Sequence, residues 1–404
     1  MKILMMRPSY NPEMSAGNHL AQDLIEDLQK EGHNVELITP VSEGFYGLPE
    51  GYKDPCVVHR VKSSVVGRSI SKRILRYIGT SFSMYKKAKN LDFDLIISHS
   101  MPPLLGPLSC MLSKKKKKPV VYWEQDIVSN SIISTGMGSS NSAKQKIMFK
   151  AALMLEKYTE KHCTHIVTIS EQFKKMHTDR GVKEDKISVL YNWIDTNHIY
   201  PKKREDNNLY EELGLCRDDF IVSYCGNLGV PQNVEIMIDT AEKLKDISDL
   251  KFLIIGNGSR EKIITEYIRK KNLPNLTYHP LYPLSQACDV YNVGDVGLVI
   301  GKKGTSENGF PSKMWSILAA GQTMISCFDI ESELSRFVRK GGCGISIEPD
   351  SAEKLAGAIE TLYKDRNFCN QCHLNSRKFA VEHAERVNAT KKFIDIVDNV
   401  GANA

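Results

Sequence analysis

The 404-residue sequence lacks an apolar run long enough to cross a bilayer, and its first residues carry too short an apolar run for a signal peptide. These absences exclude a membrane-spanning chain and predict a protein that stays in the cytoplasm. The ten cysteines show no disulfide framework, so we expect reduced and mainly buried thiols. One cysteine pattern, Cys369 to His373, has the spacing of c-type haem attachment. Haem attachment requires export and a zinc site requires a second ligand pair nearby, so a helical segment is the better interpretation.

A large overall charge is also missing, since the net charge is only +6, but the basic residues are concentrated in one region. Residues 51–150 hold 18 Lys and Arg against five Asp and Glu. Within them, residues 68–89 form a basic amphipathic pattern and residues 114–118 are five consecutive lysines. Such segments favour anionic membrane surfaces, whereas a core-packing helix beside a solvated loop would explain the same residues. Both interpretations stay open. Nucleic acid is not expected as a partner, because no binding motif accompanies the charge.

Residues 306–321, S-E-N-G-F-P-S-K-M-W-S-I-L-A-A-G, form the most informative segment. They follow an apolar run at residues 296–300, which predicts a buried strand. The loop then opens a helix with Pro311 in its first turn, where a missing N–H is harmless. Ser312 and Lys313 follow at once. We therefore expect backbone amides, a hydroxyl and an ammonium to hold a phosphate at this helix N-terminus.

Short apolar runs alternate with helical patterns along the whole chain, which predicts parallel strands joined by helices in doubly wound α/β sheets. The plan occurs twice, and a polar stretch at residues 201–208 separates the halves. The predicted parts are a Rossmann-like domain at residues 1–200, a second at 201–375, and a C-terminal helix at 376–404 that crosses back onto the first domain. Ligands of such folds bind at the carboxyl ends of the strands, which we expect to face a cleft between the domains.

Short segments in chain order resemble the signatures of one protein family. They are the loop at residues 11–19, the segments at 169–171 and 186–195, and the loops at 225–229 and 254–258. With these in place, the chain resembles the retaining glycosyltransferases of GT-B family 4. The closer resemblance is to bacterial transferases of O-antigen, capsule and colanic acid assembly, including the L-fucosamine transferase-like group. The resemblance covers nearly the whole chain and implies the GT-B fold.

This resemblance implies a site for a nucleoside diphosphate sugar, with no metal or other cofactor. The donor-binding residues that it implies are Gly17, Asn18, Gly226, Asn227, Gly256, Asn257, Leu281, Asn308, Gly309, Phe310, Pro311, Ser312, Lys313 and Ser316. The catalytic residues that it implies are His99, Asp126 and Lys313. His99 matches a family histidine near the donor sugar, although a lone histidine is more often structural. Asp126 is favoured over Glu124 as the acceptor-side acid. Lys313 would face the departing diphosphate, whose growing charge needs cations and hydrogen-bond donors.

Four positions depart from the family pattern. The family's paired glutamates, separated by seven residues, fall on Asn308 and Ser316, and its usual Arg and Lys fall on Asn227 and Gln232. Both typical cations of the diphosphate site are therefore missing, and Lys313 is the expected replacement.

We expect a retaining transferase that moves an N-acetylated hexosamine or 6-deoxyhexosamine from a UDP-sugar to a polyprenyl-diphosphate-linked glycan at the inner membrane face. The acceptor hydroxyl would attack on the leaving-group face, and a diphosphate oxygen would take its proton. The four departures leave a non-catalytic nucleotide-sugar binder open as an alternative. The shared fold also leaves open an isomerase of the UDP-N-acetylglucosamine 2-epimerase type.

Overall fold

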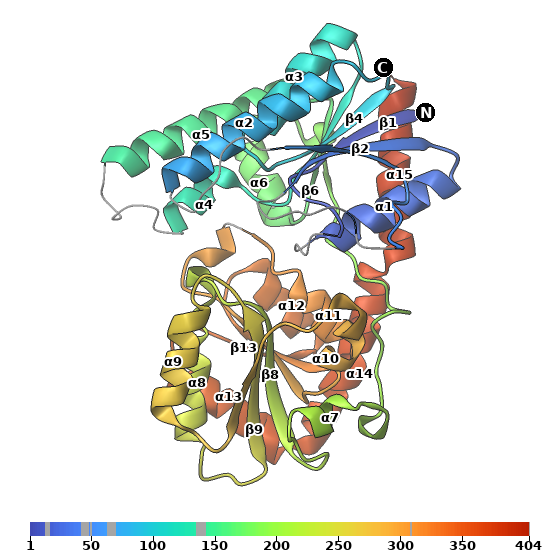
Figure 1. The fold of residues 1–404 in the computed structure, drawn as a ribbon. Coiled ribbons are helices and arrows are strands. Elements are labelled where there is room, and N and C mark those ends of the chain that lie inside the picture. Colours follow the sequence, from blue (N-terminus) through green and yellow to red (C-terminus); the bar gives the residue numbers. More distant parts are fainter. Residues whose placement is uncertain are drawn as a thin grey trace. The chain divides into compact units, whose positions relative to one another are not determined.

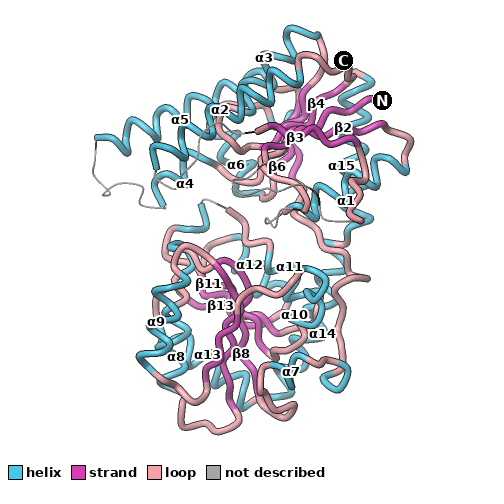
Figure 2. Tube along the Cα trace, in the orientation of Figure 1, coloured by secondary structure: helices cyan, strands magenta, loops and turns pink. Residues whose placement is uncertain are grey.

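The structure is a computed structural model that describes residues 1–12, 17–41, 48, 51–62, 70–134, 143–307 and 309–403. The chain divides into two compact units. Unit 1 comprises Met1–Tyr191 and Val387–Ala404, and unit 2 comprises Asn192–Arg386. Each unit is a parallel sheet with helices on both faces (Figures 1 and 2). The predicted doubly wound α/β plan is therefore confirmed in both units.

Unit 1 is built on seven parallel strands in the order β3-β2-β1-β4-β5-β6-β7. The strands are β1 (Lys2–Met6), β2 (Asn34–Pro40), β3 (Val57–Val61), β4 (Leu95–His99), β5 (Val120–Trp123), β6 (His165–Thr168) and β7 (Ile187–Val189). The helices are α1 (Asn18–Lys30), α2 (Ile70–Ala88), α3 (Leu105–Lys116), α4 (Val128–Ser134), α5 (Ala143–His162), α6 (Glu171–Asp179) and α15 (Arg386–Ala402). In Figure 1, α2, α3 and α5 cover one face of this sheet, and α1 and α15 lie on the other. The central strands are mostly apolar and almost entirely buried because helices cover both of their faces.

Unit 2 has six parallel strands in the order β10-β9-β8-β11-β12-β13. The strands are β8 (Phe220–Asn227), β9 (Leu250–Asn257), β10 (Leu276–His279), β11 (Val296–Ile300), β12 (Thr323–Cys327) and β13 (Gly344–Ile347). The helices are α7 (Leu209–Glu212), α8 (Glu235–Lys243), α9 (Glu261–Lys271), α10 (Ala287–Tyr291), α11 (Lys313–Ala319), α12 (Glu333–Gly341), α13 (Ala352–Lys364) and α14 (Arg366–Ala384). The main core joins α8, α9 and α13 to one face of this sheet, and Figure 2 shows α10, α11 and α14 on the other.

The C-terminal part of the chain is two helices, because α14 ends at Ala384 and α15 begins at Arg386. The break is held by Ile194, whose N–H donates to the carbonyl of Ala384 and whose carbonyl accepts from the N–H of Arg386. Beyond the break, α15 belongs to unit 1. The hydroxyl of Thr390 on α15 donates to Asp27 of α1 at 2.9 Å. The end of the chain thus completes the first unit.

None of the helices in the described part of the chain is long and apolar enough to cross a membrane. The C-x-x-C-H segment lies within α14, where Cys369 and Cys372 are buried free thiols. The Cys369 thiol lies 3.4 Å from the hydroxyl of Thr323 on β12, so this segment packs against the sheet.

Candidate active site

Lys313 is the first residue of α11, and its ammonium lies at the carboxyl end of β8. Its Nζ is 3.8 Å from the centre of the Tyr224 ring and is buried without a hydrogen-bond partner in the described part of the chain. Burial lowers the pKa of Lys313 to about 8, although the Cys225 thiol opposes this shift. A buried ammonium without an acceptor is unfavourable, and such a group usually meets a ligand. The arrangement therefore suits an anion.

Two glycines shape the backbone beside this ammonium. Gly226 has a φ of +141°, and a Cβ on it would lie 2.7 Å from Nζ of Lys313. Gly226 pairs in register with Gly256 of β9, where a Cβ would lie 2.4 Å from the Gly226 carbonyl oxygen. Only glycine fits both positions without displacing a neighbour. The ends of β8 and β9 therefore keep side chains away from the Lys313 ammonium.

The asparagines that end these strands have local partners. The side-chain oxygen of Asn257 accepts the N–H of Leu281 at 2.6 Å, which ties the end of β9 to the loop after β10. The side-chain nitrogen of Asn227 lies 3.5 Å from the side-chain oxygen of Gln232. Asn227 and Gln232, which stand where the family resemblance implied an Arg and a Lys, therefore lie side by side.

The loop before α11 differs from its sequence prediction. Ser312 is the residue preceding the helix, so Pro311 lies outside the first turn. The amides of Met314 and Trp315 donate to the carbonyls of Pro311 and Ser312, each at 3.1 Å. These two amides are therefore engaged, and the Lys313 ammonium lacks an acceptor among the described residues.

The other predicted positions of this segment fall into two groups. Phe310 is buried with its ring centre 6.2 Å from that of Trp315 and 6.0 Å from that of Phe337, so it belongs to an aromatic core. Burial raises the pKa of Tyr291, and the side chain of Ser316 acts against this shift. Gly309 lies in the loop and is partly exposed, while Asn308 lies outside the described residues.

Unit 1 brings a second group of predicted residues to the carboxyl ends of β1 and β4. Gly17 precedes α1 with a φ of +80°, and its carbonyl accepts from Nη2 of Arg7 at 3.1 Å. Asn18 is buried, and its side-chain oxygen accepts from the hydroxyl of Ser9. The turn before α1 is therefore fixed from both sides by β1 and the residues that follow it.

His99 ends β4 and is buried. Its Nδ1 accepts the N–H of Met101 at 3.0 Å, which places the ring proton on Nε2. Burial, and then the positive charge of Arg7, lower the pKa of His99 well below its ordinary value. His99 is therefore a neutral imidazole that can donate one hydrogen bond from Nε2.

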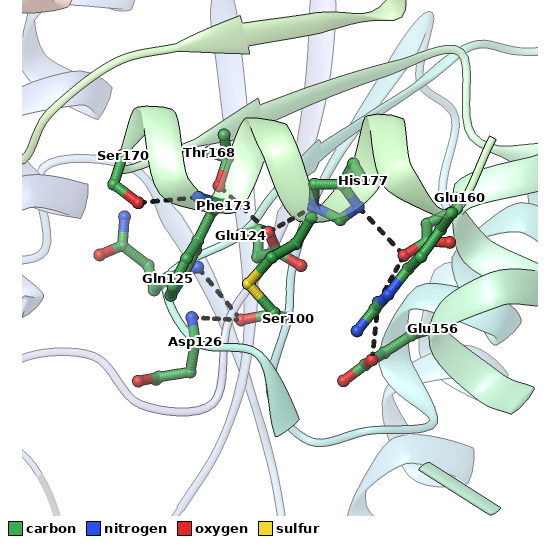
Figure 3. A network of polar contacts seen from close by, with 12 residues as sticks. Ser100, Glu124, Gln125, Asp126, Glu156, Glu160, Thr168, Ser170, Phe173 and His177 are labelled. Atoms are coloured by element: carbon green, nitrogen blue, oxygen red, sulfur yellow. Dashed lines mark hydrogen bonds and ion pairs between the residues drawn. The ribbon is translucent and has the colours of Figure 1, made fainter. Parts of the chain in front are cut away.

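Asp126 lies on the loop after β5, where the hydroxyl of Ser100 accepts the N–H groups of Gln125 and Asp126 at 3.2 and 3.4 Å. Its side chain reaches solvent. Desolvation by the surrounding protein, and then the negative charge of Glu124, nevertheless raise the pKa of Asp126 to about 6. Figure 3 shows the Asp126 carboxylate pointing away from the buried polar network behind the loop.

That network fixes Glu124. A carboxylate oxygen of Glu124 accepts from Nε2 of His177 at 2.7 Å and from the hydroxyl of Thr168 at 3.1 Å. The other ring nitrogen of His177 donates to Glu160 at 3.0 Å, and Arg180 bonds to Glu160 at 2.7 Å (Figure 3). Burial alone would lower the pKa of His177, but the two carboxylates raise it to about 10. Glu124 is thus held inside the buried network through one of its oxygens, which leaves Asp126 as the outward carboxylate of this loop.

Two features of unit 1 were not predicted from the sequence. Arg7 directly follows β1, and the only signal was a basic residue at the carboxyl end of a strand. The pairing of His177 with Glu124 and Glu160 joins residues far apart in the chain, and no spacing rule reveals it. No group of three or more His, Cys, Asp or Glu side chains among the described residues could hold a metal ion.

Comparison with known proteins gives the class of the molecule. Residues 17–198 match the family described as Glycosyltransferase Family 4, and residues 206–379 match the one described as Glycosyl transferases group 1. The chain is therefore a glycosyltransferase, with a family 4 domain followed by a group 1 domain and the GT-B fold. A solved structure, Anabaena Alr3699/HepE in complex with UDP and glucose, aligns with a TM-score of 0.75 at 16% identity, over 99% of this chain and 100% of that one.

Two relatives are named as transferases. The WcaI protein of Escherichia coli (strain K12), which carries the name of a colanic acid biosynthesis glycosyl transferase, is 24% identical over 417 residues. That alignment spans 98% of this chain and 99% of WcaI. The UDP-Gal:alpha-D-GlcNAc-diphosphoundecaprenol alpha-1,3-galactosyltransferase of Escherichia coli is 24% identical over 196 residues, 47% of each chain.

Proposed function

We propose that the protein transfers a sugar, with retention of anomeric configuration, from a UDP-sugar to a polyprenyl-diphosphate-linked glycan during assembly of a bacterial surface polysaccharide such as capsule or O-antigen. The transferred sugar is an N-acetylated hexosamine or a 6-deoxyhexosamine. The reaction takes place at the cytoplasmic face of the membrane and uses no metal. The observation that carries the proposal is the buried ammonium of Lys313, which has no partner among the described residues, beside Gly226 and Gly256.

A diphosphate leaving group suits this part of unit 2. Its charge grows as the glycosidic bond breaks, and a cation already stripped of water interacts strongly with it. The family's usual cations are replaced by Asn227 and Gln232, so Lys313 supplies the charge in this chain. Gly226 and Gly256 let phosphate oxygens approach the backbone and the ammonium together.

Unit 1 supplies groups for the sugar and the acceptor. His99, neutral with its proton on Nε2, donates a hydrogen bond to a sugar hydroxyl. Asp126, the outward carboxylate of the loop after β5, accepts a hydrogen bond from the acceptor and orients its hydroxyl. The acceptor oxygen attacks the anomeric carbon on the face that the diphosphate leaves, and a diphosphate oxygen takes the proton.

The names of the related proteins support the substrates. One structural neighbour was solved with UDP and glucose, and one relative is named for UDP-Gal and a diphosphoundecaprenol-linked acceptor. A third is named for colanic acid biosynthesis. These names agree with a nucleotide-linked donor and a lipid-linked acceptor.

An anionic membrane surface is the partner we propose for α2 and for the lysines at residues 114–118, which end α3 and follow it. Leu75 and Phe82 of α2 are 56% and 52% exposed, and Lys114 and Lys115 are also exposed. Part of the lysine run has local roles instead, since Lys118 pairs with Asp94 at 3.2 Å. Apolar side chains beside exposed ammonium groups match the boundary between acyl chains and anionic headgroups.

Flotation with anionic liposomes tests this surface. We expect the double variant Leu75→Glu and Phe82→Glu to lose most of its vesicle binding and keep its activity on a soluble acceptor. The matched control is Leu374→Glu, which changes another exposed apolar side chain in unit 2. Equal flotation of all three proteins would refute the membrane contact.

The donor is tested first by calorimetric titration with UDP, GDP and ADP at fixed salt. Selective UDP binding should be followed by transfer from labelled UDP-sugars to a short polyprenyl-diphosphate-linked glycan, with product anomeric configuration read by NMR. Lys313→Met should weaken UDP binding by about 10- to 100-fold, the effect of losing hydrogen bonds to a charged group. Lys270→Met, an exposed lysine at the far end of α9, is the control. Transfer of no UDP-sugar to any lipid-linked acceptor would sink the proposal.

A further inference from the structure

Arg7 is a buried cation in unit 1 that the function described above does not use. Its side chain is 2% exposed, and its Nε and Nη1 atoms have no hydrogen-bond partner in the described residues. Its Nη2 donates to the carbonyl of Gly17 at 3.1 Å. One of its three nitrogen atoms is therefore used to hold the turn before α1, and two retain unused N–H donors.

The described residues around Arg7 supply no counter-charge. No carboxylate among the described residues lies within ion-pair distance of its guanidinium. The guanidinium carbon lies 5.0 Å from the centre of the Trp123 ring, and the neighbouring His99 is neutral. Burial lowers the pKa of Arg7 to about 10, with Tyr10 acting in the opposite direction. The guanidinium stays charged at neutral pH all the same.

Arginine is almost never fully buried unless it is paired. Leaving a charged donor without an acceptor costs more than the net gain from an ordinary hydrogen bond. The contact with Trp123 offsets part of this cost, since a cation over an aromatic ring is worth about 0.5–2 kcal/mol. It leaves the in-plane N–H groups of the guanidinium without acceptors. An anion with oxygens near the guanidinium plane would supply the acceptors that the described residues do not.

We propose that Arg7 is the anion-binding residue of unit 1 and that its ligand is a diphosphate group carried by one of the two substrates. Arg7 directly follows β1 and so lies at the carboxyl ends of the strands, where parallel α/β folds bind ligands. Its neighbours there are Gly17 and His99. The N–H groups of Nε and Nη1 lie in the guanidinium plane and have no acceptor among the described residues, so they can donate to phosphate oxygens. The identity of the ligand rests on the proposed function, because both the UDP-sugar and the polyprenyl-linked acceptor carry a diphosphate.

A purely structural Arg7 predicts a different behaviour from a ligand-binding one. If Arg7 served only to stabilise unit 1, replacing it would lower the thermal stability of the free protein. If it awaits a ligand, Arg7→Met removes an unpaired buried charge and keeps a side chain of similar length. The variant should then unfold at the wild-type temperature or above it without ligand, because removal of an uncompensated charge is neutral or stabilising. Stabilisation by an added anion should be lost, since it depends on binding to the folded state.

The experiment compares wild type, Arg7→Met, Arg7→Lys and Lys89→Met, the last being an exposed lysine of unit 1. Each is titrated with inorganic diphosphate, UDP and farnesyl diphosphate, by calorimetry and by thermal unfolding. Inorganic diphosphate is also titrated against Lys313→Met, alone and combined with Arg7→Met, so that binding in unit 2 is removed. We expect Arg7→Met to weaken diphosphate binding about 10- to 100-fold, and Arg7→Lys, which keeps the charge without the paired donors, to retain part of it.

The three probes distinguish the two sources of the diphosphate. A loss of UDP affinity in Arg7→Met assigns Arg7 to the donor. A loss of farnesyl diphosphate affinity with UDP unchanged assigns it to the acceptor. Unchanged affinity for all three probes in Arg7→Met, or in Arg7→Lys if the methionine variant does not fold, overturns the inference. If diphosphate binding depends on Arg7 but no UDP-sugar is transferred, the inference stands and the proposed function fails.

Discussion

The ammonium nitrogen of Lys313 lies 3.8 Å from the centre of the Tyr224 ring, at the carboxyl end of β8. The aromatic face gives the cation a favourable neighbour without giving it a counter-ion. The charge is therefore held in place and remains available to a ligand. Unit 1 has a similar contact, because the guanidinium carbon of Arg7 lies 5.0 Å from the centre of the Trp123 ring. Each Rossmann-like unit thus keeps one buried cation against an aromatic ring.

The affinity for UDP should depend on the charge of Lys313. Burial lowers its pKa from 10.5 to about 8, so the free protein begins to lose this charge just above neutral pH. A bound diphosphate stabilises the ammonium and raises that pKa again. We therefore expect UDP affinity to fall by up to about tenfold per pH unit above pH 8, which calorimetry between pH 7 and pH 9.5 would measure. Lys313→Met should bind weakly with no such pH dependence. A decline of equal slope in both proteins would assign the titration to another group.

Gly226 should act on UDP binding through Lys313. A Cβ at this position would lie 2.7 Å from Nζ, and the φ of +141° disfavours any other residue. We expect Gly226→Ala to displace the ammonium and lower UDP affinity about tenfold, with little further loss when combined with Lys313→Met. A double-mutant cycle by calorimetry measures this coupling. Additive losses would mean that Gly226 contributes independently of the lysine.

The doubly wound plan of both sheets could be predicted from the sequence, whereas β3, β7 and β13 carry little sequence signal. The central strands are mostly apolar because helices cover both of their faces. The strands β3, β7 and β13 lie at sheet edges and are largely half-buried. A short edge strand has no long apolar run and no strict alternation, so its sequence resembles a loop. The break between α14 and α15 at Glu385 was not predicted either. Its cause is a backbone contact with Ile194, a residue far away in the sequence.

The candidate site shows the same division. Gly226 and Gly256 lie near the ends of strands and Gly17 precedes α1, positions where the sequence led us to expect glycines of a binding site. A phosphate-binding role for Lys313 stays a prediction, and its contact with Tyr224 depends on how α11 packs. Arg7 could not be predicted, because the absence of a partner becomes visible only when all the neighbouring side chains are placed.

His177 should stabilise unit 1 in a pH-dependent way. It lies between Glu124 and Glu160, and its pKa is raised from 6.5 to about 10. A raised pKa in the folded state means that the stabilisation is complete below pH 6.5 and is lost as the pH rises through about 10. We expect His177→Gln to lower stability at pH 6 by about 3 kcal/mol, because two buried carboxylates lose the cation between them.

Thermal and denaturant unfolding of wild type and His177→Gln at pH 6, 7.5 and 9.5 would test this. The difference between the proteins should shrink as the pH rises. Lys175→Gln, which removes an exposed charge from the same helix, should leave stability nearly unchanged. A difference that is constant across the pH range would show that His177 acts in its neutral form.

Asp126 should contribute to transfer without contributing to UDP binding. Its carboxylate is exposed on the loop after β5, while Lys313 and the strand ends of unit 2 form the site that we propose for the nucleotide. We expect Asp126→Asn to lower kcat/KM for the lipid-linked acceptor by about 100-fold, a typical contribution of one positioned carboxylate.

Because the pKa of Asp126 is about 6 and the carboxylate form is the active one, wild-type kcat/KM should rise with pH through about 6. The asparagine variant should lack this rise and keep wild-type UDP affinity. Asp179→Asn, which neutralises an exposed carboxylate of unit 1, is the matched control. Loss of UDP affinity in Asp126→Asn would instead place this carboxylate in donor binding, and an unchanged rate would remove it from the reaction.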